Sequence, residues 1–242
     1  MKKDFFYFSV LKVGAFSVVI TGVCFFIIAI CALFAPKAVA SYVTSTAYFD
    51  EFMWYQEYFI LIKYLMFVAF AAMIGFIISI YYHKCRPQNG LFILLSVLAI
   101  LGIGIGMLQS ITDATRVPHL AQEYENSSDI IRHVIIAFGV ANPAIYMLSL
   151  GLPGLWLIFL NIWMRKEFSL FLVLSGFAWG IGSVVTVIGH LFVILPIIHF
   201  IAFGAVFGVP VWTYLQTKFL LKCRKDAMAK SLSDTGGYYD TH

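Results

Sequence analysis

Residues 91–111 read LFILLSVLAILGIGIGMLQSI, a run of 21 residues without one charged side chain. An α-helix needs about 20 mainly apolar residues to cross the hydrocarbon core of a bilayer. Lipid-facing side chains need no polar partner, so such a run is stable in a membrane and unfavourable in water. The stretch therefore predicts a membrane-spanning helix.

The composition of the whole chain agrees with this prediction. Of its 242 residues, 62% are hydrophobic and 12% are charged, against roughly 45–50% and about 25% in an average soluble protein. The net charge of +4 is small, and the basic residues lie in short clusters between apolar runs. Composition thus excludes an ordinary soluble domain, and no nucleic-acid partner is expected.

Further apolar runs predict an all-α, polytopic transmembrane helix bundle of about six spans, forming a single domain over residues 1–230. The fourth run is exceptional, since it would measure about 46 Å as one helix and contains Pro143 and Pro153. We expect it to be kinked or to begin outside the bilayer. A polar loop over 112–132 precedes it, and residues 231–242 form a flexible cytoplasmic tail. The predicted spans are about 13–34, 58–82, 91–111, 134–163, 169–189 and 195–217.

The distribution of lysine and arginine predicts the orientation. If the N-terminus is cytoplasmic, 12 of the 16 basic residues fall on the cytoplasmic side, as the positive-inside rule requires. Both termini are then cytoplasmic. The 12 are Lys2, Lys3, Lys12, Lys84, Arg86, Arg165, Lys166, Lys218, Lys222, Arg224, Lys225 and Lys230.

Glycines at short spacing indicate where helices pack closely. Small residues four apart let membrane helices approach each other. The candidates are Gly102, Gly104 and Gly106 in the third span, Gly176 and Gly180 in the fifth, and Gly204 and Gly208 in the sixth.

The interrupted fourth run is the first candidate for a binding site. Each proline removes an N–H donor and frees a backbone carbonyl, and broken helices in transporters expose such groups to substrate. Asn142 and Tyr146 would supply side-chain contacts nearby. A proline kink satisfied by neighbouring helices is the alternative.

Lys63 is the one lysine inside a predicted span, close to its outer end. We expect it to snorkel to the interface, or alternatively to line a polar cavity. Gln109 and Asp113 lie four residues apart on one helix face, and either Lys63 or Arg116 is a suitable partner for them. Lys63, Gln109 and Asp113 therefore join Asn142 and Tyr146 as candidate ligand-binding residues.

Histidines and acids on the predicted outer side give a second candidate site. Such groups can bind a divalent metal, and histidines that flank spans can ligate haem iron. His119 with Glu123, and Asp129 with His133, have the i,i+4 spacing that places side chains on one helix face. Solvated loop residues are the alternative. The set comprises His119, Glu123, Asp129, His133, His190 and His199.

The segment LGLPGLW at 150–156, the Arg165-Lys166 turn and the glycine-rich fifth span resemble a group of small bacterial multi-pass membrane proteins of unknown function. The resemblance implies a bacterial inner membrane and supplies no mechanism.

Three classes of function stay open from the sequence. The first is a small transporter or membrane ligand-binding protein with its site near the interrupted fourth run. The second is a metal or haem redox protein that uses the outer histidines. The third is a non-catalytic structural subunit, in a homo-oligomer or a larger membrane complex. An enzyme is the less favoured expectation, because no serine-nucleophile motif such as GxSxG occurs.

Overall fold

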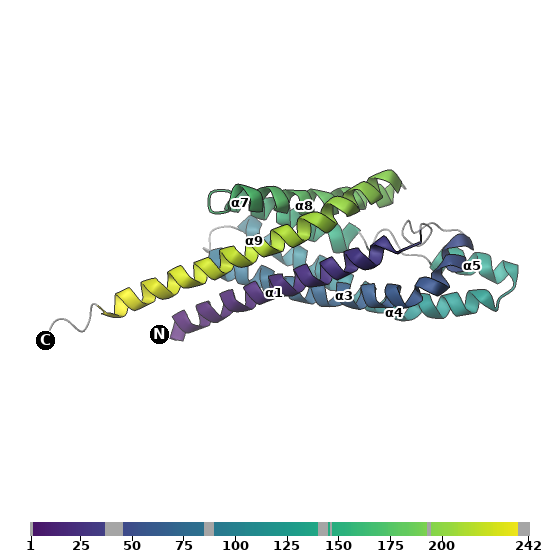
Figure 1. The fold of residues 1–242 in the computed structure, drawn as a ribbon, viewed down its shortest axis with the longest axis horizontal. Coiled ribbons are helices and arrows are strands. Elements are labelled where there is room, and N and C mark those ends of the chain that lie inside the picture. Colours follow the sequence, from purple (N-terminus) through teal and green to yellow (C-terminus); the bar gives the residue numbers. More distant parts are fainter. Residues whose placement is uncertain are drawn as a thin grey trace.

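The computed structural model describes residues 2–36, 46–84, 90–139, 145, 147–192 and 195–236. Every regular element in these ranges is a helix, which confirms the predicted all-α class. Figure 1 shows the elements and their labels. They are α1 (Lys2–Leu33), α3 (Thr46–Lys84), α4 (Gly90–Glu125), α5 (Asp129–Gly139), the π-helix η1 (Met147–Gly151), α7 (Leu152–Met164), α8 (Leu170–Leu191) and α9 (Leu195–Gly236).

Four of the described helices are long and apolar enough to cross a membrane. They contain the segments Phe6–Cys31, Tyr48–His83, Gly90–Glu125 and Leu170–Gly189, and a shorter apolar segment covers Leu148–Met164. These four correspond to the first, second, third and fifth predicted spans. Such helices are consistent with a membrane protein.

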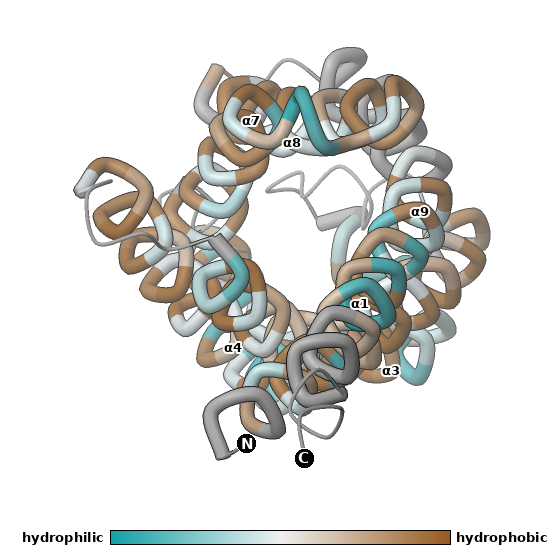
Figure 2. The backbone as a smooth tube through the Cα atoms, turned by 90° about the vertical axis from the view of Figure 1, so that its left-hand side faces the viewer, coloured by the Kyte–Doolittle hydropathy of each residue, from teal (hydrophilic) through white to brown (hydrophobic). Residues whose placement is uncertain are grey.

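The long helices form a ring. α1 packs on α3, α3 on α4, α4 on α7, α7 on α8, α8 on α9, and α9 on α1, as the end-on view in Figure 2 shows. The start of α1 and the end of α9 lie at one end of the bundle, here called the termini end, and α5 lies at the opposite, far end (Figure 1).

Aromatic side chains fill the interior of this ring. The Phe76 ring meets Trp156 edge-on at 5.7 Å between centroids and Trp212 at 5.3 Å, and Trp212 meets Trp179 at 5.0 Å. These four side chains come from α3, α7, α9 and α8, so one aromatic chain connects four helices. The Trp156 indole N–H also donates to the Ser96 hydroxyl at 3.0 Å, which ties α7 to α4.

The far ends of α3 and α4 continue beyond the predicted spans. At 39 and 36 residues they measure about 58 and 54 Å, well over a ~30 Å hydrocarbon core. They enclose a second core, and α5 covers it. Its buried residues are Tyr48, Phe49, Phe52, Tyr55, Phe59, Val117, Ala121, Tyr124, Ile135 and Ile136.

This second core corrects the predicted polar loop over 112–132. The helix runs on to Glu125, with Pro118 inside it, because Val117, Ala121 and Tyr124 pack against the aromatic face of α3. Arg132 then bonds the end of α4, since its guanidinium donates to the Tyr124 and Glu125 carbonyl oxygens at 2.9 and 3.0 Å.

The fourth predicted span contains three described elements, while Pro143 lies outside the described residues and Pro153 is in the first turn of α7. α5 lies at the far end, and η1 and α7 occupy the ring beside α4. Gly102 and Gly106 form the contact with η1. A Cβ at position 102 would meet the Leu148 carbonyl oxygen, and one at position 106 would lie 3.0 Å from the Ser149 Cβ. Gly104 has nothing within 4 Å, so the close packing expected there is wrong.

The glycines of α8 behave as predicted. A Cβ at Gly180 would lie 2.9 Å from the Gly154 carbonyl oxygen of α7, and a Cβ at Gly176 would overlap the Asn161 amide. In α9, Gly208 makes only ordinary contacts, at 3.9 Å, and the side-chain surroundings of 195–207, including position 204, lie outside the described residues.

Candidate functional site

Two oppositely charged side chains meet between α3 and α4. The Lys63 ammonium lies 2.8 Å from the Asp113 Oδ2, and these side chains are 3% and 2% exposed. The Gln109 amide donates to the other carboxylate oxygen at 2.6 Å. Both oxygens of Asp113 therefore have a hydrogen-bond donor, one from each helix.

Helix geometry explains why these three residues meet. Gln109 and Asp113 are four apart on α4, so they share one face. α3 and α4 pack side by side, and this contact places Lys63 opposite that face. Lys63 and His83 are separated by about 30 Å along α3. His83 lies at the termini end, because its Nδ1 is 2.6 Å from the hydroxyl of Tyr7 near the start of α1. The pair is thus about one hydrocarbon thickness from the termini end.

The surroundings of the pair are aromatic on one side and basic on the other. The Phe59 ring, one turn before Lys63, lies 5.0 Å from its ammonium, in the range of a cation–π contact. The Arg116 guanidinium lies 3.9 Å from Asp113 Oδ1, with 43% of its side chain exposed. Among the described residues, two cations thus share one carboxylate, and these three charged groups sum to +1.

The predicted partnership of Asp113 with Lys63 is confirmed, and Arg116 approaches the same carboxylate. Gln109 bonds Asp113. The predicted snorkelling of Lys63 is wrong, since its ammonium turns toward α4 and is buried. A charge removed from water costs several kcal/mol unless it is paired and hydrogen-bonded. Asp113 of the neighbouring helix supplies both the opposite charge and the hydrogen-bond acceptor for Lys63.

The other two predicted ligand-binding residues, Asn142 and Tyr146, lie outside the described residues. The described part of the interrupted segment includes η1, which meets α4 at Gly106. Gly106 precedes Asp113 by two turns, about 10 Å along the helix. The ion pair and η1 therefore lie along the same buried face of α4, with Ser110 between them.

The candidate metal residues at the far end point into solvent where they are described. His119, Glu123 and His133 are exposed, and the Asp129 side chain is 92% exposed. His133 Nδ1 lies 2.7 Å from the backbone oxygen of Asp129 rather than from its carboxylate. No group of three or more His, Cys, Asp or Glu residues that could hold a metal occurs in the described part of the chain. The side chains of His190 and His199 lie outside it.

Sequence reasoning missed one buried polar group altogether. Gln216 of α9 is fully buried, and neither atom of its amide has a hydrogen-bond partner among the described residues. The indole N–H of Trp212, one turn earlier, and the Asn161 Oδ1 are also without one. A glutamine within an apolar stretch was the available signal, but only the ring arrangement shows that it faces inward.

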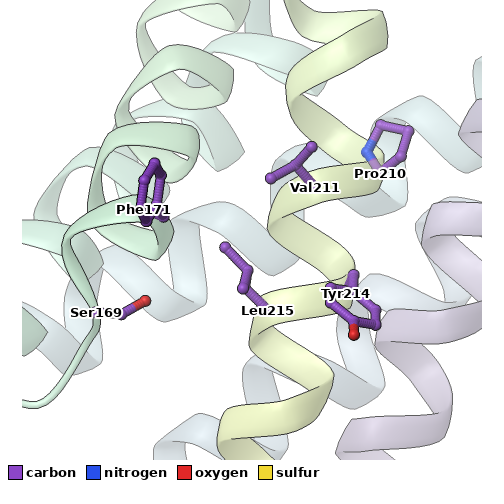
Figure 3. Close-up of a pocket in the computed structure, with 6 residues that line it drawn as sticks. All are labelled: Ser169, Phe171, Pro210, Val211, Tyr214 and Leu215. Carbon is purple, nitrogen blue, oxygen red and sulfur yellow. The ribbon is translucent and has the colours of Figure 1, made fainter.

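Apolar grooves also lie away from the ion pair. One of about 480 Å³ lies between the start of α8 and α9 and is lined by Phe171, Pro210, Val211, Leu215, Ser169 and Tyr214 (Figure 3). The Ser169 hydroxyl accepts a bond from the Leu172 N–H at 3.3 Å, so it caps α8. None of its described lining residues is charged, and the Lys63–Asp113 cluster remains the best candidate for a functional site.

Comparison with known protein families, with curated proteins and with solved structures gives no match.

Proposed function

We propose that this protein is a small membrane transporter or ligand-binding protein for a small anion, and that the Lys63–Asp113 cluster is the group that responds to the anion. The observation that carries the proposal is the ion pair itself, buried between two helices that are long and apolar enough to span a membrane. Ionisable residues inside membrane segments are costly and commonly serve ion or substrate pathways.

The charge balance favours an anionic solute. Lys63 and Arg116 approach one carboxylate, Asp113, so an incoming carboxylate or phosphate can take over one of the two cations. Asp113 would keep the other cation and its bond from Gln109. Such an exchange of partners changes how α3 and α4 are held together, which couples binding to helix movement.

The experiment uses the purified full chain in proteoliposomes. Currents are recorded after concentration jumps of acetate, succinate, phosphate and sulfate, and thermal unfolding is measured with the same anions in detergent. At 100 times its dissociation constant, a bound anion stabilises the folded state by about 2.7 kcal/mol. We expect at least one of these anions to give both signals, and Lys63→Gln to abolish both.

Arg132→Gln is the matched control, because it removes a basic residue at the same end of the bundle but outside the cluster. We expect it to leave the anion responses unchanged. Absence of a response to all four anions would refute the proposal. Responses that persist in Lys63→Gln would show that the pair is only a structural contact.

The proposed setting is a bacterial inner membrane, with six spans and both termini in the cytoplasm. The common position of the start of α1 and the end of α9 supports an even number of crossings. A green fluorescent protein fused after His242 should fluoresce in a bacterial host, and alkaline phosphatase at the same site should be inactive. The reverse result would refute this topology.

A further inference from the structure

A groove with both apolar and basic walls lies at the termini end, between the start of α4 and the end of α7. Its volume is about 510 Å³, within the range of small-molecule sites. It is lined by Leu91, Phe92, Leu95, Phe159, Ile162, Trp163, Arg165 and Lys166.

The two kinds of lining residue are separated along the groove. The apolar residues come from the first two turns of α4 and the last turns of α7, so they lie on the membrane side. Arg165 and Lys166 follow the end of α7 in the turn toward α8, and both are exposed. Glu167 comes directly after them, and the turn keeps a net positive charge.

Tryptophan marks the boundary between these two regions. Trp163 lies between the apolar wall and the basic turn, and its ring packs on Phe92 with 4.4 Å between centroids. Trp side chains favour the level of lipid headgroups, where one edge is apolar and the other is wet. The groove therefore passes from acyl-chain depth to headgroup depth.

We infer that this groove binds one anionic phospholipid. Arg165 and Lys166 hold its phosphate, and one acyl chain lies along Leu91, Leu95 and Ile162. Leu91 and Ile162 are 56% and 47% exposed, so a lipid chain can reach them. This inference does not depend on the proposed function, because the groove is at the start of α4, about 30 Å along the helix from Asp113.

Charge complementarity distinguishes this groove from two other grooves on the bundle. Among the described residues, none that lines the α8–α9 groove of Figure 3 is charged. The same is true of the groove between α1 and α9 that Val19, Phe26 and Thr217 help to line. Those surfaces suit acyl chains of any lipid. Basic pockets between membrane helices are known to recognise anionic headgroups.

The test measures lipid binding to the full chain by native mass spectrometry. The probes are palmitoyl-oleoyl phosphatidylglycerol, phosphatidylcholine with the same acyl chains, and inorganic phosphate. Each basic residue near an anionic lipid contributes a factor of about five in affinity. Arg165→Gln with Lys166→Gln should therefore weaken phosphatidylglycerol binding roughly 25-fold.

Lys222→Gln with Lys225→Gln is the matched control, because these exposed lysines of α9 carry the same charge outside the groove. This pair should bind phosphatidylglycerol like the wild type. Leu95→Trp, which fills the apolar wall without changing charge, should also weaken binding. Equal binding of phosphatidylcholine, an equal loss in the control pair, or displacement of the lipid by millimolar phosphate would each overturn the inference.

Discussion

Replacing Gly102 with leucine should lower the free energy of unfolding by at least about 3 kcal/mol, because overpacking a tight contact already costs about 1–3 kcal/mol. A Cβ at this position would meet the Leu148 carbonyl oxygen and would lie 3.1 Å from the side chains of Leu152 and Pro153. The oxygen belongs to the backbone of η1, which cannot move aside without separating α4 from α7. Thermal unfolding in detergent measures the loss.

Gly104→Leu is the matched control for this variant. It makes the same change two residues away, where a Cβ meets nothing within 4 Å. Leucine also has a higher helix propensity than glycine, so Gly104→Leu should equal or slightly exceed the wild type in stability. Equal destabilisation by both substitutions would show that Gly102 is not a packing contact.

Lys63→Met should destabilise the protein by about 3–5 kcal/mol, the range observed when one partner of a buried ion pair is removed. The loss arises because Asp113 keeps its charge in a buried site, where Gln109 and the more distant Arg116 are its remaining partners among the described residues. Unfolding in a denaturing detergent measures the effect. Arg116→Gln should cost no more than about 1 kcal/mol, since its contact is longer and partly exposed.

The double variant Lys63→Met, Asp113→Leu separates stability from function. Removing both charges leaves no buried unpaired ion, since Arg116 is partly exposed, so stability should return to near the wild-type value or above it. The anion responses should nevertheless stay absent, because the proposed binding groups are gone. A double variant as unstable as Lys63→Met alone would contradict the pairing seen in the structure.

Part of the site could be predicted from the sequence. Gln109 and Asp113 share a helix face whatever the tertiary structure is, because their spacing is four residues. Lys63 stands out as a charge in an apolar run, so it required a partner or a route to water. The sequence could not choose between these outcomes. The choice depends on whether the side of α3 that carries Lys63 packs against α4 or faces lipid.

The continuation of α3 and α4 beyond the predicted spans illustrates a different limit. Hydropathy identifies the part of a helix that suits lipid, and it ends at about Ile111 in the third span. The helix itself ends at Glu125, because aromatic side chains of α3 give its polar segment a core to pack on. Long-range contacts of this kind leave no signal in a local apolar run.

The amino-acid sequence by itself determined the all-helical class and the apolar segments, because both depend on sums over neighbouring residues. Only the tertiary structure decided which side of each helix faces another helix. It separated Gly102 from Gly104, turned Lys63 inward, and buried Gln216. The physical reason is that a membrane helix is apolar all round, so its own sequence pattern does not mark its buried face.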